Sequence, residues 1–232
     1  MSTLNDDEQL ESLKSFTKKY GSAIMTGILI ALIAFFGWQY WQKKNLLENQ
    51  NRTAEYQKLL EQSTKIQDDA GYKSFISEVD SLVKTHPDSA QAVQAELLMA
   101  SQAVERNDYA AAEKALLRVE NTAVKDEGLK HLIWLRLAYI QTELKKYDAA
   151  LKNLDRIKDE NFIATAQEAR GDIFVAQNKT DLAKAEYQKA WDALIARQQE
   201  RKILQLKLQS VGVLVEDPNL DSPIVKTQTD EG

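Results

Sequence analysis

Residues that could carry out chemistry are few in this chain and lie far apart. The 232 residues include two histidines and no cysteine, which excludes disulfides, thiolate metal sites and thiol nucleophiles. His86 stands before Pro87 and His131 opens an expected helix, and neither has a partner at the spacing of metal ligands. Phosphate-binding, dinucleotide-binding and nucleophile-elbow motifs are missing as well. We therefore expect no catalytic residue, cofactor or metal, and we interpret both histidines as surface or interfacial side chains.

The composition favours a folded, helical protein that does not bind nucleic acid. Hydrophobic residues make up 44% of the chain, more than a disordered protein would carry. Glycine occurs 8 times and proline 3 times, while alanine, leucine, lysine, glutamate and glutamine dominate, and these are good helix formers. The formal net charge of −5 argues against a nucleic-acid partner, for which a basic surface is typical.

One apolar stretch, residues 21–41, is long enough to cross a bilayer. As a helix it would span roughly 27–32 Å, the thickness of the hydrocarbon core. It has lysines on both sides, at 18–19 and 43–44. Its end carries Trp38 and Trp41, which suit the membrane interface, and it has no small-residue cleavage site of a signal peptide. We predict an uncleaved transmembrane helix over residues 21–41.

Within this span, Ala23, Gly27 and Ala31 form a row of small residues that would let another helix approach closely. No charged residue lies in the span, so we interpret it as an anchor or docking helix and not as an ion path. Small residues are also common in membrane helices generally, so docking through this row, including self-association of the chain, is left open.

The head, residues 1–20, begins with a capping-box pattern of Asn5 and Glu8. Apolar residues then recur at helical spacing, which predicts either a short amphipathic helix lying on membrane lipid or a loosely helical lead-in. Basic residues are nearly balanced on the two sides of the span, so charge does not predict its orientation.

Beyond the span, three stretches resemble one another: residues 95–119, 133–157 and 166–190. Each reads as a helix, a turn and a second helix, and a weaker fourth copy lies upstream of them. Small residues recur where two antiparallel helices must approach closely. These residues are Ala100, Ala138 and Gly171 in the first helices, and Ala112, Ala150 and Ala183 in the second.

The spacing in these stretches matches the tetratricopeptide signature, at Trp134, Leu137, Ala138, Ala150 and Leu154 and again at Gly171, Phe174, Ala183, Tyr187 and Ala190. We therefore predict an all-α protein: one N-terminal transmembrane helix and a tetratricopeptide-like α-solenoid over residues 42–211. A generic helical bundle is the alternative. Residues 42–67 are expected to form one continuous helix and residues 191–211 a long capping helix, with the charged run 197–202 on its solvated face. Residues 212–232 are expected to be a flexible tail.

Such a solenoid offers a groove lined by its first helices. None of the residues expected there is Lys or Arg, which disfavours a basic clamp for a C-terminal carboxylate. The mixture instead suits a polypeptide segment, basic or partly unfolded, unless several of these residues only pack the fold. The expected groove residues are Gln94, Leu97, Ser101, Val104, Glu105, Leu132, Leu135, Tyr139, Thr142, Glu143, Thr165, Glu168, Asp172, Val175 and Ala176.

From residue 8 to about 211 the chain resembles the ancillary SecYEG translocon subunit family of bacterial inner membranes. The resemblance is carried by Gly37, Trp38, Tyr40 and Trp41 and by the runs 135–138 and 154–173. It implies a single-pass inner-membrane protein with a cytoplasmic N-terminus and a periplasmic repeat domain. It also implies that the Sec translocon subunits and periplasmic chaperones or exported polypeptides are partners. The alternative is an anchored regulator or assembly factor for another inner-membrane complex or a stress-response protein.

Overall fold

The computed structural model describes the backbone of residues 3–199 and 201–215, and all regular elements in these two ranges are α-helices. The chain divides into two compact units, Met1–Glu55 and Tyr56–Gly232, which are described separately below.

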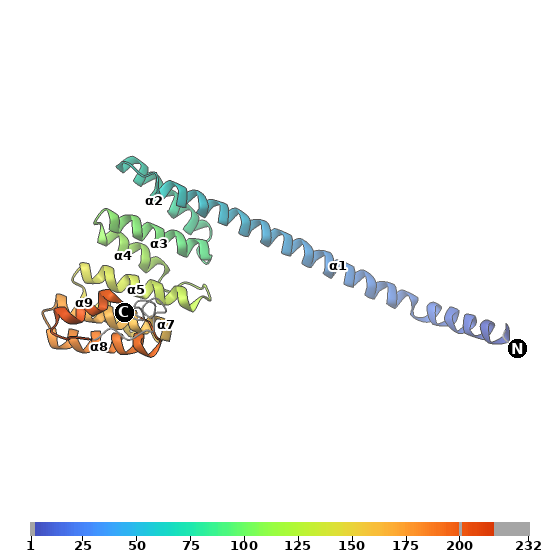
Figure 1. The fold of residues 1–232 in the computed structure, drawn as a ribbon. Helices are drawn as coiled ribbons and strands as arrows, with labels where there is room; N and C mark the ends of the chain where they lie inside the picture. Colours follow the sequence, from blue (N-terminus) through green and yellow to red (C-terminus); the bar gives the residue numbers. More distant parts are fainter. Residues whose placement is uncertain (1–2, 200, 216–232) are drawn as a thin grey trace, which may run out of the picture. The chain divides into compact units, whose positions relative to one another are not determined.

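The first unit consists of helix α1 (Thr3–Ser63) as far as Glu55 (Figure 1). The stretch from 21 to 41 lies within this helix, and its described side chains are almost all exposed. Among the described residues, α1 is the one helix long and apolar enough to cross a membrane, and the best window has a mean hydropathy of 1.9. A helix suits such a stretch because it satisfies every backbone group internally. Most side chains of the head lie outside the described ones, so its amphipathic character stays a prediction.

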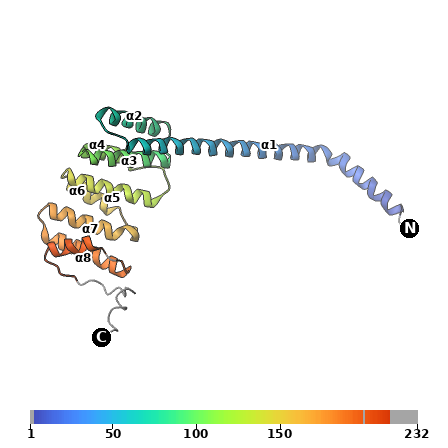
Figure 2. The ribbon, with the colours of Figure 1, turned by 45° about the horizontal axis from the view of Figure 1, so that its top comes forward.

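The second unit is a stack of antiparallel hairpins, α3–α4, α5–α6 and α7–α8, which follow one another in chain order (Figure 2). These hairpins coincide with the three similar stretches of the sequence, which confirms the predicted solenoid. The last residues of α1 and helix α2 precede them, and α9 follows. The helices after α1 are α2 (Asp69–Thr85), α3 (Ala90–Glu105), α4 (Tyr109–Val119), α5 (Glu127–Glu143), α6 (Tyr147–Asp155), α7 (Glu160–Ala176), α8 (Thr180–Ala196) and α9 (Lys202–Ser210).

Short polar side chains set where five of these helices begin. An Asp or Ser at the N-cap accepts a hydrogen bond from a backbone N–H of the first turn, which would otherwise have no partner. The hydrogen bonds are 2.7–3.1 Å long, and the capping residues are Asp68, Ser89, Asp108, Asp126 and Asp159.

One turn geometry closes all three hairpins and is then used a fourth time. Asn107, Lys145 and Asn178 have φ of 58–59°. In each turn the following N–H bonds back to a carbonyl five residues earlier, as in a Schellman motif. Gln198, at φ 55°, forms the same turn between α8 and α9, where Gln199 N–H donates to Leu194 O at 2.9 Å.

That fourth turn corrects two expectations. Residues 191–211 are not one long helix, because α8 ends at Ala196 and the chain reverses into α9. The reversal buries Leu204 and Leu208 completely, whereas an extended helix would leave them in solvent. The run 197–202 is not simply a solvated face either. Arg197 donates to the carbonyl oxygen of Glu160 at 2.8 Å, and Arg201 is paired with Glu168.

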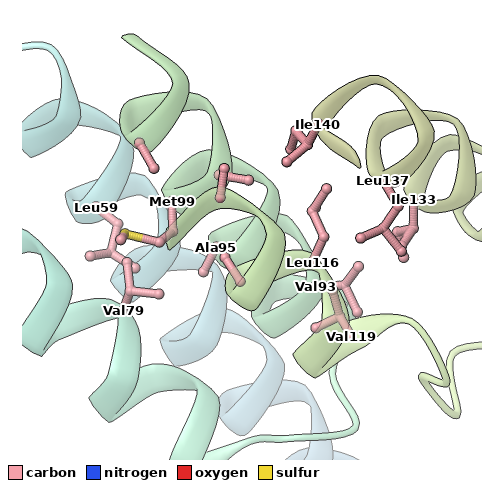
Figure 3. Packing of buried hydrophobic residues seen from close by; sticks show 14 of the residues in the cluster. Leu59, Val79, Val93, Ala95, Met99, Leu116, Val119, Ile133, Leu137 and Ile140 are labelled. Carbon is pink, nitrogen blue, oxygen red and sulfur yellow. The ribbon is translucent and has the colours of Figure 1, made fainter. Parts of the chain in front are cut away.

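The core follows the stack in three clusters, the largest of which joins the end of α1 to α2, α3, α4 and α5. Figure 3 shows Leu59, Val79 and Met99 pointing toward one another at one end of this cluster, and Leu116 and Leu137 at the other. The small residues predicted from the repeats are buried, as close helix packing requires. The second cluster joins α5, α6 and α7, and the third joins α7, α8 and α9.

Candidate functional site

A cleft of about 640 Å³ runs along the first helices of the three hairpins. Three helices, α3, α5 and α7, supply most of its lining because each hairpin presents its first helix on the same side of the stack. Helices α4 and α9 add one residue each. The lining residues are Leu97, Ala100, Ser101, Val104, Tyr109, Arg136, Tyr139, Ile140, Thr142, Glu143, Ala169, Asp172, Ala176 and Lys207.

The structure brings together eight of the fifteen residues that the sequence placed in a groove: Leu97, Ser101, Val104, Tyr139, Thr142, Glu143, Asp172 and Ala176. The other seven do not line this cleft. Leu135 is buried in the second core cluster, and Gln94 is exposed elsewhere on α3. Glu105 lines a different pocket, with Arg106. Glu168 lies behind the cleft, bonded to Lys207, and Leu132, Thr165 and Val175 lie outside the lining.

Sequence reasoning missed six lining residues, two of which change the character of the cleft. Arg136 and Lys207 are both basic, so the expectation of a groove without Lys or Arg is wrong. Arg136 was detectable, because positions 136, 139, 140 and 143 share one face of a helix at i, i+3, i+4 and i+7. Lys207 was not, since it reaches the cleft only through the unpredicted turn at Gln198.

A charged network on α7 and α9 forms one end of the cleft. Lys207 Nζ lies 2.8 Å from Glu168 Oε1 and 2.7 Å from Asp172 Oδ2. Arg201 Nη1 lies 2.6 Å from Glu168 Oε2. Burial opposes ionisation of Glu168, but hydrogen bonds from Lys207 and Arg201 outweigh it and lower the pKa of this carboxyl. Burial likewise opposes the charge on Lys207, yet the two carboxylates raise its pKa, so the network stays ionised and fastens α9 to α7.

Two tyrosines face this network as neutral phenols. Tyr187 donates its hydroxyl hydrogen to Asp172 at 2.7 Å, and burial together with that carboxylate raises the pKa of Tyr187. Burial, and then the charges of Glu168 and Asp172, raise the pKa of Tyr139. Tyr139 is nevertheless 41% exposed and lines the cleft, so it offers a ligand both an apolar face and a hydroxyl group.

The middle of the cleft combines apolar surface with two charges of opposite sign. Leu97 and Val104 from α3 and Tyr139 from α5 supply apolar area, and Val104 is 37% exposed. Arg136 and Glu143 on α5 are exposed, and no ion pair is recorded for either within the described part of the chain. Apolar surface with a few polar groups is what a bound polypeptide segment requires.

The histidines take no part in this cleft. His131 packs edge-on against Trp134, with ring centroids 5.3 Å apart, and tilted against Phe162 at 5.4 Å. It is therefore an interfacial packing residue between two hairpins. In the residues that the structure describes, no cluster of three or more His, Cys, Asp or Glu side chains could hold a metal ion.

The small-residue row of the apolar helix is described only in part. Gly27 and Ala31 are exposed, and a Cβ atom added at Gly27 would meet no atom within 4 Å. The side chain of Ala23 lies outside the described ones. Docking through this row stays a prediction.

Fold and cleft together define a class of protein: a tetratricopeptide-repeat-like solenoid that follows one apolar helix and carries a cleft along its first helices. The family model for the tetratricopeptide repeat-like domain matches residues 14–213. Three curated relatives are ancillary SecYEG translocon subunits. The protein of Haemophilus influenzae is 29% identical over 90% of this chain and 98% of its own length. That of Neisseria gonorrhoeae is 29% identical with the same coverage, and that of Escherichia coli 30% identical over 82% and 86%.

The chain belongs to the ancillary SecYEG translocon subunit family. No solved structure matches it.

Proposed function

We propose that this protein is a membrane-anchored interaction partner of the Sec translocon, and that its cleft holds polypeptide segments. The observation that carries the proposal is the cleft itself, with apolar and tyrosine surface along α3 and α5 on a solenoid tied to one apolar helix. The names of the relatives, which are ancillary subunits of the SecYEG translocon, supply the identity of the neighbouring complex.

In this proposal the helix spans the bacterial inner membrane once, with the head in the cytoplasm and the solenoid in the periplasm. The cleft would then meet polypeptides as they leave the channel and help to pass them to periplasmic chaperones. Digestion of spheroplasts with external protease tests the orientation: the solenoid is degraded while the membrane stays intact. A protected solenoid contradicts the periplasmic placement and favours a regulator acting on the cytoplasmic side.

Site-specific photocrosslinking tests the use of the cleft. A photoreactive phenylalanine analogue at Tyr139 should capture exported polypeptides or chaperones in intact cells. The same analogue at Lys184, an exposed position on α8 outside the cleft, is the matched control. Equal capture at both positions would mean that the cleft has no special role.

Association with the channel is tested by co-purification from membranes in mild detergent. We expect the full chain to recover Sec channel subunits, and a bulky Gly27→Ile substitution in the small-residue row to reduce that recovery. Ile28→Leu, on a different face of the helix, is the control. If the unaltered chain recovers no channel subunit, the association with the translocon is wrong.

A further inference from the structure

The described chain ends against α9, the helix that supplies Lys207 to the cleft. Gly212, at φ 81°, reverses the chain, and Val213 N–H then donates to Leu208 O at 2.9 Å. Val215 is held by a 3.3 Å hydrogen bond from Gln205 Nε2 to its carbonyl oxygen. Residues 216–232, which the structure does not describe, therefore start from a point fixed on a helix that lines the cleft.

These 17 residues have a composition suited to an extended ligand. Five acidic residues against one lysine give a net charge of 5 × (−1) + 1 = −4. Between the acidic ends lies the run 218–225, PNLDSPIV, in which two prolines disfavour a helix and favour extended backbone. At about 3.3 Å per residue the segment can reach about 55 Å, which exceeds the length of any hairpin in the stack. The family match ends at residue 213, so this segment lies beyond the shared domain.

The cleft combines apolar surface with exposed charges of both signs, and so does the segment. Lys207 and Asp172 neutralise one another at one end, which leaves Arg136 and Glu143 as the exposed charges of opposite sign. They stand seven residues apart on α5, which is about 10 Å along the helix. In the segment, Asp221 and Lys226 are likewise of opposite sign and lie on either side of the apolar pair Ile224 and Val225. In extended backbone they stand about 16 Å apart, and the long side chains of Arg136 and Lys226 can bridge the difference of about 6 Å.

We propose that residues 216–232 bind back into the cleft of the same chain and compete there with other polypeptides. Ile224 and Val225 occupy the apolar surface of Leu97, Val104 and Tyr139, with Asp221 toward Arg136 and Lys226 toward Glu143. Because the segment is tethered, its effective concentration at the cleft is in the millimolar range. An outside polypeptide must displace it, so the cleft opens only to ligands that are abundant or tightly bound. The inference rests on the proposed use of the cleft by polypeptides.

The absence of native cysteine makes a direct test available in the full-length chain. Ser101→Cys with Ile224→Cys places one thiol in the cleft and one in the segment. Lys184→Cys with Ile224→Cys is the control, because Lys184 is exposed and outside the cleft. Mild oxidation followed by mass spectrometry of digested protein should show the disulfide at least several-fold more abundantly in the cleft pair. Equal yields in the two pairs would overturn the proposal.

Mixing ¹⁵N-labelled and unlabelled chains shows whether the segment in the cleft belongs to the same chain or to a second copy. Disulfides within one chain carry a single label, as we expect, whereas mixed-label disulfides would show that a second copy fills the cleft and would refute the proposal. Arg136→Glu should lower the yield about two- to five-fold, the range of an exposed ion pair, and Arg136→Glu with Asp221→Lys should restore it. An unchanged yield in Arg136→Glu would overturn the assigned contact.

This readout is independent of the translocon. A chain that shows no cleft disulfide but still recovers Sec channel subunits refutes self-binding alone. A chain that forms the disulfide but recovers no channel subunit refutes only the association with the translocon.

Discussion

At the residue scale, Gly171 shows how the repeat pattern adapts when the side chain that packs against the small residue becomes larger. In the first two hairpins the small residue is Ala100 or Ala138, and the residue that fills the groove is a leucine. In the third hairpin the groove is filled by Tyr187, and a Cβ atom added at Gly171 would lie 2.2 Å from its ring. The ring is buried, so it has no room to retreat.

Gly171→Ala is therefore expected to lower the free energy of unfolding by about 1–3 kcal/mol, as overpacking of a core does. Urea denaturation of the full chain, followed by circular dichroism, measures this loss. In the Tyr187→Leu background the same substitution should cost much less, because it recreates the alanine–leucine pair of the other hairpins. If Gly171→Ala costs the same in both backgrounds, the ring contact is not the reason for the glycine.

A second residue, Glu96, makes the stability depend on pH. Its side chain is 0% exposed, with Arg118 Nη2 2.9 Å from Oε2 and no hydrogen-bond partner recorded for Oε1. Burial outweighs Arg118 and raises the pKa of Glu96 from 4.5 to about 7. The folded state thus keeps a proton that the unfolded chain releases, so this contribution to stability is complete below pH 4.5 and is lost as the pH rises through about 7.

Glu96→Gln removes that titration. We expect the variant to be more stable than the unaltered chain at pH 8 by on the order of 1–3 kcal/mol, with a flatter pH dependence between pH 5 and 8. Urea unfolding at several pH values measures both. A Glu96→Gln profile parallel to that of the unaltered chain would contradict the raised pKa.

At the scale of elements, the left-handed turn is the unit that repeats most regularly. Three hairpin turns and the α8–α9 turn all place a residue other than glycine at φ of 55–59°. Asn adopts this conformation more readily than most residues because its short polar side chain can hydrogen-bond locally, whereas the long side chains of Lys145 and Gln198 lack this property. The turn is therefore set by helix packing on both sides and not by the residue at its centre.

Because Lys145 is strained at positive φ and Asn178 is less so, we expect replacement by glycine to change the free energy of unfolding by different amounts at the two positions. Lys145→Gly should raise the free energy of unfolding by about 0.5–1 kcal/mol, since glycine adopts positive φ without strain. Asn178→Gly, in the same turn of the next hairpin, should change it by a few tenths of a kcal/mol at most. Equal effects in denaturant titrations of the two variants would show that strain at Lys145 is not significant.

At the scale of the whole molecule, the apolar helix and the solenoid fall into separate compact units, so a substitution that keeps the helix out of a membrane should leave the solenoid folded. Ile30→Arg with Ile33→Arg places two charges in the middle of the apolar helix, at about 2.5–3.5 kcal/mol each on the insertion scale. We expect the protein to leave the membrane fraction on alkaline extraction while the thermal unfolding of the solenoid is retained. Ile30→Leu with Ile33→Leu is the control. A solenoid that unfolds in the arginine variant would contradict the independence of the units.

The sequence by itself determined the features that depend on local pattern. Helix-forming composition, the apolar run at 21–41 and the spacing of Ala100, Ala138 and Gly171 are readable without coordinates, because close helix packing selects small residues at fixed intervals. The same spacing also indicated more than half of the cleft lining. The start of each capped helix is local too, since an Asp or Ser bonds a backbone N–H only two or three residues away.

Only the tertiary structure decided what depends on contacts far apart in the chain. The reversal at Gln198 is stabilised by the burial of Leu204 and Leu208 against α8, and no local signal such as glycine marks it. That reversal brings Lys207 and Arg201 to Glu168 and Asp172, 33 to 39 residues away, and so makes the end of the cleft charged. Helical periodicity shows which side chains share a face. Which face meets which partner depends on how much apolar surface each packing arrangement removes from water.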